Sequence, residues 1–277
     1  MIIKDLSHSE YHKRPEIGAS DLKQFRLSPS HFRYWKDHET EETYSQRLGT
    51  LTHCLILEPE KFSERFCCGG KKLNWVTKEG REQKAWAQDT EVEGLKVVWD
   101  HELQASEMMD KSVRSNGFAK NLLGCDGLVE CTILSQVLDT QCKCRPDKLV
   151  DEGPIIDLKT TRCAHKDFFA KDALKFGYHI QAGLYLDIIH AERGSNETEH
   201  FIIAIENEPP YGVCIHQLGK MEIELGRHEY QKYLTLLQEC LEYDSWPGYP
   251  DKPQELHFPR YAFDKEFMSF FNETTEI

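Results

Sequence analysis

The chain has 277 residues, of which 39% are apolar and 11% aromatic, so it can bury a sizeable core and is not a wholly disordered chain. Its formal net charge of -13 argues against a passive, wholly basic nucleic-acid coat. Apolar runs such as 54–57 and 201–205 are too short to span a bilayer, and the first ten residues lack the apolar stretch of a signal peptide. We therefore expect a cytoplasmic protein without a membrane partner.

The first half of the sequence predicts mainly helices. Ser20 and either Ser28 or Ser30 are suitable helix N-caps. Gly49 lies inside a predicted helix, where it costs about 1 kcal/mol relative to alanine, so it suggests close packing. The predicted segments are short helices within 1–45, a helix over 42–57, a glycine-bearing loop over 67–75, and helices over about 77–89 and 101–115.

From residue 126 the apolar pattern changes to period two, which is typical of strands. Strands are predicted over 127–135, 140–150, 154–160, 200–206 and 211–217, and helices over about 166–175, 177–192 and 221–243. A proline-bearing tail follows Trp246. The order predicts an α/β fold in one domain over 1–277, made of a mainly helical part (1–125), a sheet core (126–220) and a C-terminal helix and tail (221–277).

Ten cysteines occur without a single CxxC pair, so the sequence lacks the usual zinc or redox spacing. Free thiols in a reducing compartment are the simplest interpretation. Cys142 and Cys144 alternate along a predicted strand and so share one face, which leaves an iron–sulfur or zinc site as an alternative.

The segment around Glu152 carries the clearest chemical pattern. Asp147 lies five residues before Glu152 and Asp157 five residues after it, so a hairpin centred there makes the two carboxylates cross-strand neighbours, with Cβ atoms about 5 Å apart. Lys159 points to the same face as Asp157. Two adjacent carboxylates repel unless a cation lies between them, and a hard divalent ion such as Mg²⁺ or Mn²⁺ fits. An exposed hairpin with an ordinary salt bridge is the alternative.

This pattern resembles the PD-(D/E)xK nuclease superfamily, and four motifs in order resemble its exonuclease VIII (RecE-type) branch of phage recombination nucleases. The resemblance extends from about Tyr11 to the Pro259-Arg260 tail. The motifs are Leu48-Gly49-Thr50-Leu51-Thr52-His53, Cys144-Arg145-Pro146-Asp147-Lys148, Asp157-Leu158-Lys159-Thr160-Thr161, and Tyr178-His179-Ile180-Gln181 with Tyr185.

The resemblance implies a restriction-endonuclease-like core, in which helices flank a central mixed sheet, with a helical N-terminal elaboration. It implies two Mg²⁺ ions per active site, with Mn²⁺ as a substitute. The implied metal ligands are His53, Asp147, Asp157 and the Leu158 carbonyl. The other implied catalytic residues are Glu130 near the metals, Lys159 at the attacking water, and Gln181 and Tyr185 as positioning groups.

The implied activity is hydrolysis of double-stranded DNA from its ends, 5′ to 3′, to 5′-mononucleotides. A 3′ single strand would remain for a single-strand annealing recombinase, in a phage or prophage setting, and the protein would form a toroidal trimer or tetramer. A catalytically silent DNA- or protein-binding module, an endonuclease of the same fold and an iron–sulfur nuclease are the alternatives. The last lacks a C-terminal cysteine cluster, because only Cys240 follows Cys214.

Basic residues gather near the motif: residues 143–175 hold eight Lys or Arg against six Asp or Glu. A phosphate-binding track is predicted to include Arg145, Lys148, Arg162 and Lys166. Solvated surface charge is the alternative for each of them. Weaker candidates are Lys23, Arg26, Arg33, Lys71 and Lys72. Three tail phenylalanines, Phe267, Phe270 and Phe271, are expected to pack onto the core.

Overall fold

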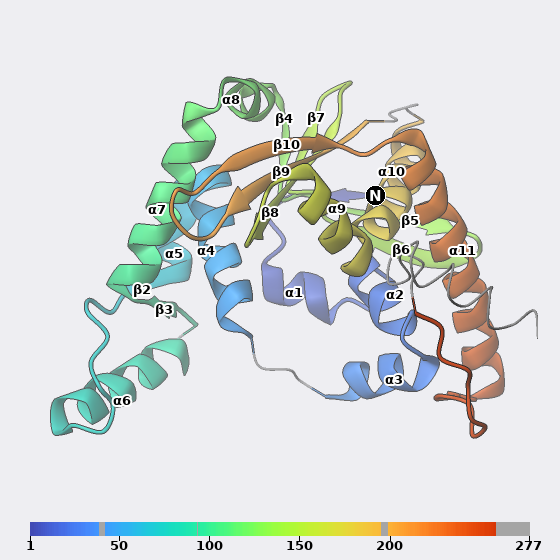
Figure 1. Cartoon of the computed structure of the whole chain (residues 1–277), viewed down its shortest axis with the longest axis horizontal. Coiled ribbons are helices and arrows are strands. Elements are labelled where there is room, and N and C mark those ends of the chain that lie inside the picture. Colours follow the sequence, from blue (N-terminus) through green and yellow to red (C-terminus); the bar gives the residue numbers. More distant parts are fainter. Residues whose placement is uncertain (39–41, 93, 195–198, 259–277) are drawn as a thin grey trace, which may run out of the picture.

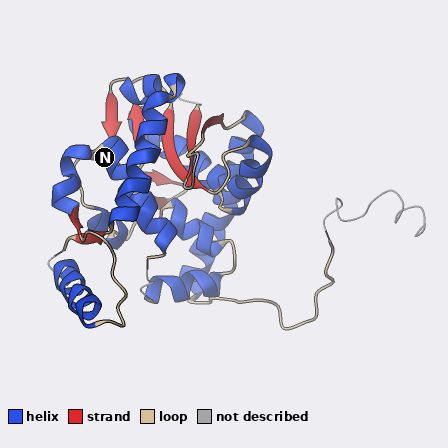
Figure 2. Cartoon of the chain, turned by 60° about the vertical axis from the view of Figure 1, so that its left-hand side comes forward, coloured by secondary structure: helices blue, strands red, loops and turns tan. Residues whose placement is uncertain are grey.

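A computed structural model describes residues 1–38, 42–92, 94–194 and 199–258. It confirms the predicted α/β fold, a central mixed sheet with helices on both faces and further helices built from the N-terminal part (Figures 1 and 2). None of the helices in these ranges is both long and apolar enough to cross a membrane. The three predicted phenylalanine contacts of the tail lie outside the described residues.

The helices are α1 (His8–Lys13), α2 (Ala19–Phe25), α3 (Pro29–Asp37), α4 (Tyr44–Leu57), α5 (Phe62–Arg65), α6 (Lys78–Val92), α7 (Asp100–Ser115), α8 (Gly117–Gly124), α9 (Lys166–Lys175), α10 (Tyr178–Arg193) and α11 (Lys220–Tyr243), with a 3₁₀ turn at Pro59–Lys61. The strands are β1 (Ile2–Ile3), β2 (Phe66–Cys68), β3 (Lys96–Val98), β4 (Gly127–Val129), β5 (Thr132–Val137), β6 (Thr140–Cys144), β7 (Lys148–Val150), β8 (Ile155–Thr161), β9 (His200–Glu206) and β10 (Val213–Gln217). Helix α6 projects away from the body of the molecule (Figures 1 and 2).

The main sheet has the strand order β10-β9-β8-β7-β4. Its neighbouring strands are antiparallel except β8 and β9, which run parallel and are joined by the helices α9 and α10. A smaller sheet has the order β1-β5-β6, and β2 pairs with β3 in parallel. Because parallel strands need a crossover, the helices α9 and α10 form the connection that returns the chain from the end of β8 to the start of β9.

Strand β8 separates two apolar cores. Ile155 packs with α10 and the small sheet, whereas Ile156 and Leu158 pack with α4, α7 and α8. Since side chains alternate along a strand, Asp157 shares the α10 face with Ile155. Thr160 lies on the α4 face. A Cβ added to Gly49 of α4 would lie 3.4 Å from the hydroxyl oxygen of Thr160. The helix α4 therefore approaches the sheet closely at Gly49, as its sequence position suggests.

Two segments that were each predicted as one strand are each divided into two strands in the structure. The segment predicted as one strand over 127–135 is β4 and β5, which belong to different sheets, and Glu130 between them has a φ of 47°. The segment predicted over 140–150 is likewise divided into β6 and β7. Period-two patterns cannot reveal such a change of sheet, because both pieces keep the alternation.

Several local predictions are wrong and others are confirmed. The helix α2 begins after Gly18, so Ser20 is not its N-cap, whereas Ser28 caps α3 by accepting from the amide of His31. The short helix α8 was not predicted; Asn116 both ends α7 and caps α8, by accepting from the Ala119 amide. Cys142 and Cys144 are buried free thiols of the core, and no metal-ligand group among the described residues includes them.

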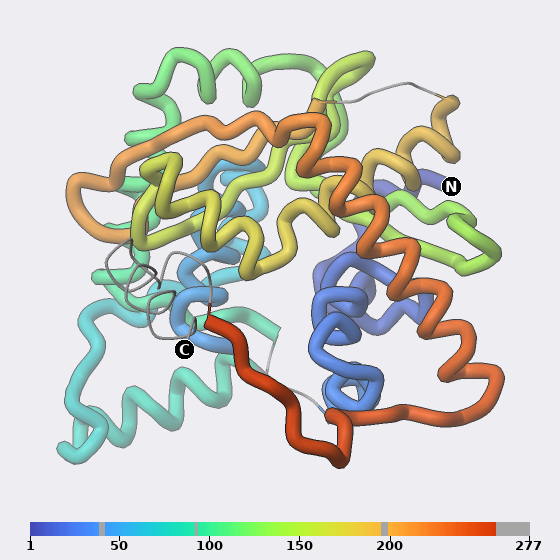
Figure 3. Tube along the Cα trace, turned by 45° about the vertical axis from the view of Figure 1, so that its right-hand side comes forward, coloured from blue at the N-terminus to red at the C-terminus, as the bar shows by residue number. Residues whose placement is uncertain are grey.

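The helices α10 and α11 lie side by side and touch backbone to backbone at two glycines (Figure 3). A Cβ added to Gly226 of α11 would lie 1.9 Å from the His179 carbonyl oxygen, and one added to Gly183 of α10 would lie 2.7 Å from the Arg227 nitrogen. Because these neighbours are backbone atoms, they cannot move aside without displacing a helix.

We therefore expect Gly226→Ala to lower the free energy of unfolding by roughly 2 kcal/mol or more, although alanine favours helices by about 1 kcal/mol. Urea unfolding measures this change. Gly117→Ala is the control, because nothing lies within 4 Å of its added Cβ. Equal stability of the two variants would show that the helices can separate without cost.

Candidate active site

The hairpin of β7 and β8 brings Asp147 and Asp157 together. Lys148 pairs with Ile156 and Leu149 with Ile155, so continuing the register by one pair sets Asp147 opposite Asp157, as predicted. The Oδ2 atom of Asp147 accepts a 2.5 Å hydrogen bond from the Leu158 amide. Both carboxylates are buried. The turn geometry alone therefore creates a pair of adjacent buried carboxylates.

An acidic cluster, consisting of His53, Glu130 and Asp147, lies at this end of the hairpin. One ligand atom from each residue falls within 4.8 Å of the other two, the one such group among the described residues. His53 comes from α4, and its Nδ1 lies 3.5 Å from Oδ1 of Asp147. Glu130 comes from the bend between β4 and β5, where its amide bonds to the Asp147 carbonyl. Three separate segments thus converge on one point.

Burial and the neighbouring charge of Asp147 raise the pKa of Glu130 to about 7. For His53, burial alone would lower the pKa, but Asp147 outweighs it and raises the value. Arg145 brings one positive charge to this cluster, because its Nε donates a 2.9 Å hydrogen bond to Glu130. Two carboxylates and an imidazole are suitable ligands for a hard divalent cation.

Asp157 has a different environment, dominated by donors and cations. Its Oδ2 accepts a 2.9 Å hydrogen bond from Nε2 of Gln181 and lies 2.6 Å from Nε2 of His200. Its Oδ1 lies 3.6 Å from Nζ of Lys159 and has no hydrogen-bond partner, although it is buried. Burial would raise the pKa of Asp157, but Lys159, followed by His200, holds it well below its usual value.

The charges of both carboxylates, Asp157 and Asp147, act on Lys159. Burial would lower its pKa, but Asp157 and then Asp147 raise it above the ordinary value. Its ammonium lies 5.5 Å from the ring centroid of Tyr178, a cation–π contact. A protonated Lys159 can therefore donate to an anionic group at the site. It is not prepared to act as a base in this arrangement.

Helix α10 holds both carboxylate-bearing segments through two residues one turn apart. Gln181 binds Asp157, and the hydroxyl of Tyr185 donates to the Arg145 carbonyl at 3.4 Å, close to Asp147. Both side chains are buried. They act on the protein itself, which agrees with the positioning role that the sequence suggests. Leu158 has a buried side chain, and its backbone lies beside Asp147.

The four predicted phosphate contacts divide into two pairs. Arg145 is half-buried and donates from Nε to Glu130, and Lys148 is buried and donates to the Leu123 carbonyl, so neither is free for a phosphate in this conformation. Arg162 and Lys166 are exposed near the end of β8 and at the start of α9. The sequence could not separate these pairs, because strand alternation does not distinguish a buried lysine from an exposed one.

The sequence analysis did not predict His200 as a site residue, and it gave Lys23 only as a weaker candidate for the phosphate-binding track. His200 starts β9 and is brought beside Asp157 by the parallel pairing of β8 and β9, for which the sequence carries no local signal. Lys23 of α2 donates a 3.0 Å hydrogen bond to Oε1 of Gln181, so it belongs to the site.

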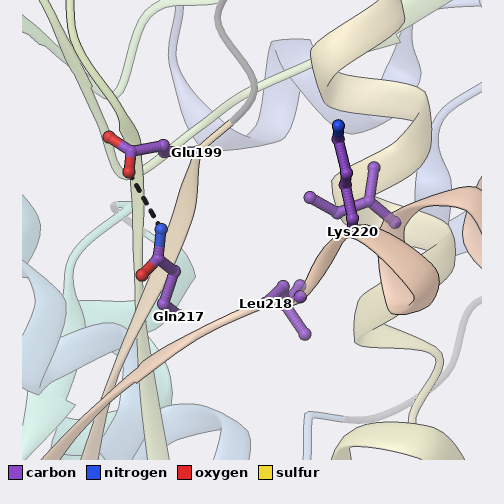
Figure 4. Close-up of a pocket in the computed structure, with 6 residues that line it drawn as sticks. Glu199, Gln217, Leu218 and Lys220 are labelled. Atoms are coloured by element: carbon purple, nitrogen blue, oxygen red, sulfur yellow. Dashed lines mark hydrogen bonds between the residues drawn. The ribbon is translucent and has the colours of Figure 1, made fainter.

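A pocket at Glu199, Gln217 and Lys220 lies where β9, β10 and the start of α11 meet (Figure 4). None of the residues of the candidate active site lines it.

Comparisons with known proteins agree with this geometry. Residues 18–256 match the family described as a PDDEXK-like domain of unknown function (DUF3799). A candidate exonuclease from Eubacterium rectale has a similar structure, with a TM-score of 0.63, 13% identity, and coverage of 95% of this chain and 99% of that one. No protein with a curated description matches.

A second structure, an alkaline exonuclease from Laribacter hongkongensis, aligns with a TM-score of 0.30 and 13% identity over 67% of this chain and 95% of that one. The family match identifies the family of this chain, because it spans most of the chain and contains every residue of the site. The chain belongs to the PDDEXK-like family and has its PD-(D/E)xK fold.

Proposed function

We propose that this protein is a metal-dependent nuclease that hydrolyses phosphodiester bonds in DNA. One observation carries the proposal: Asp147 and Asp157 lie opposite each other on a hairpin, with Lys159 beside them and His53 and Glu130 completing an acidic cluster. A silent binding module would not need this set of charges. The finer proposal is an exodeoxyribonuclease acting on double-stranded ends, 5′ to 3′, that leaves a 3′ single strand for an annealing recombinase.

The roles of the residues follow from their surroundings. A bound Mg²⁺ would supply an activated water and shield the phosphate charge. His53, Glu130 and Asp147 would hold it, with Asp157 and the Leu158 carbonyl as the further ligands we propose. Lys159, kept protonated by its carboxylate neighbours, would donate to the attacking water or to the phosphate as negative charge develops there.

Other parts of the proposal follow from the family resemblance. They are a second ion per site, Mn²⁺ as a substitute, one nuclease domain over the whole chain, a toroidal trimer or tetramer, and a phage or prophage role in the bacterial cytoplasm. The exposed Arg162 and Lys166 would contact the DNA backbone.

The deciding experiment digests a linear duplex that carries one 5′-phosphorylated, end-labelled strand, with Mg²⁺ or with Ca²⁺. Mononucleotides released from the 5′ end only with Mg²⁺ are the expected result. Binding in Ca²⁺ without cleavage in Mg²⁺ would favour a silent module. Cuts in circular DNA would instead identify an endonuclease.

Lys159→Met should reduce cleavage by about 10²–10³-fold, because it removes a proposed donor to the developing charge while keeping the side chain's bulk. Asp157→Ala should abolish cleavage. Turnover is measured under saturating duplex, with circular dichroism to check the fold. Near-normal turnover of the lysine variant would contradict the proposed mechanism.

Glu130→Gln tests the acidic cluster through stability. The pKa of Glu130 in the fold, about 7, exceeds its ordinary value, so the folded protein retains a proton that the unfolded chain has lost. The free energy of unfolding without metal should therefore fall by roughly 2–3 kcal/mol as pH rises from 4.5 to 7, and this fall should vanish in the variant.

Urea unfolding in EDTA at pH 5 and pH 8 measures the effect of this substitution. Added Mg²⁺ should reverse the difference at pH 8, because the wild-type carboxylate then gains a cation. Glu64→Gln, at an exposed position of α5, is the control. A wild type and a Glu130→Gln variant with the same pH dependence would contradict the assignment.

The phosphate contacts predict a salt effect. Arg162→Ala and Lys166→Ala should each weaken duplex binding in Ca²⁺ and reduce the slope of log K against log salt by about 1. Fluorescence anisotropy over a salt series measures both quantities. Unchanged slopes would remove these two residues from the DNA track.

A further inference from the structure

Asp157 can serve a reacting group only if its carboxylate is held in one orientation. Gln181 and His200 both lie against Oδ2, so Oδ1 is the atom turned toward Lys159. Oδ1 is also the buried atom without a hydrogen-bond partner. The two contacts at Oδ2 therefore determine which oxygen remains for chemistry.

The contact from Gln181 depends on which way its side-chain amide faces. An amide has one donating end and one accepting end, and a 180° flip would turn its oxygen toward the carboxylate. The Oε1 end accepts a hydrogen bond of 3.0 Å from Nζ of Lys23. With Oε1 committed to Lys23, the Nε2 end is left to donate to Asp157.

The stem of Lys23 lies beside Gly177, where an added Cβ would lie 3.2 Å from Cγ and 3.6 Å from Cε of Lys23. Its ammonium lies 5.5 Å from the ring centroid of Tyr178, the same ring that Lys159 approaches at 5.5 Å. Burial and the charge of Lys159 lower the pKa of Lys23 to about 7, but an amine donates a hydrogen in either charge state.

We propose that Lys23 is a positioning residue that acts through Gln181: it fixes the direction of the Gln181 amide and thereby keeps Oδ1 of Asp157 directed at Lys159. That the oriented carboxylate serves a metal ion and a phosphodiester rests on the proposed function. The orientation itself does not. Outer hydrogen-bond partners of this kind are worth about 10–100-fold in metal affinity or activity.

The test is a double-mutant cycle with Lys23→Met, Gln181→Met and the double variant. Methionine keeps most of the lysine stem, so the packing on Gly177 is preserved. Lys36→Met is the matched control, because Lys36 also contacts α2, through an ion pair with Asp21, and does not reach Gln181. Melting temperatures establish that each variant is folded.

Three readouts are compared. The first is the side-chain amide signal of Gln181 in the metal-free protein, recorded by ¹⁵N NMR and assigned by its loss in Gln181→Met. The second is Mn²⁺ affinity by calorimetry. The third is kcat and KM on linear duplex DNA.

Lys23→Met should shift the Gln181 signal, weaken Mn²⁺ binding by about tenfold, and lower kcat with little change in KM. The double variant should be no worse than Gln181→Met alone, and Lys36→Met should leave all three readouts unchanged. An unmoved Gln181 signal, or losses that multiply in the double variant, would overturn the proposal.

A rise in KM alone would also overturn it, since that result would make Lys23 a phosphate ligand. If the wild type cleaves no DNA, the proposed function fails, but the Gln181 signal still decides the role of Lys23.

Discussion

Asp157 lies in the middle strand of the five-stranded sheet with 1% of its surface exposed. A carboxylate in such a place is costly unless cations or hydrogen-bond donors surround it. Lys159 supplies the charge, and Gln181 and His200 supply the neighbouring nitrogens. Ile155, Ile156 and Leu158 of the same strand pack in the two apolar cores, so the strand that carries Asp157 belongs to both the fold and the site.

The crossover connection from β8 to β9 carries two of the partners of Asp157, Gln181 and His200. After β8 the chain passes through α9 and α10 and returns as β9, parallel to β8. Gln181 is carried by the helix of this connection and His200 by its returning strand. The glycine contact between α10 and α11 fixes how closely the helix can lie, because a side chain at Gly226 would meet the His179 carbonyl two residues before Gln181. The close packing of α10 on α11 therefore lies two residues from the amide that donates to Asp157.

The sequence predicted what depends on short separations. The opposition of Asp147 and Asp157 follows from a hairpin around Glu152, and the helices α9 and α10 follow from their patterns and flanking signals. It did not predict what depends on tertiary placement. Glu130 was included through the family resemblance, but the break at which it lies was not predicted, and His200 reaches Asp157 only through a parallel pairing. His53 could be included by resemblance alone, because nothing local links α4 to the hairpin.

The two opposed carboxylates have opposite electrostatic settings, although they are equivalent in the hairpin. Asp157 is surrounded by donors and cations, so its orientation is complete within the protein. Asp147 lies beside Glu130, whose pKa is raised first by burial and then by the charge of Asp147, although Arg145 donates a hydrogen bond to Glu130. A divalent cation would therefore reduce the repulsion between the carboxylates of Asp147 and Glu130. The carboxylate of Asp157 would already be oriented by its protein contacts. This asymmetry makes Asp157 and its partners the fixed part of the site, and the cluster of His53, Glu130 and Asp147 the part whose charge an ion would change.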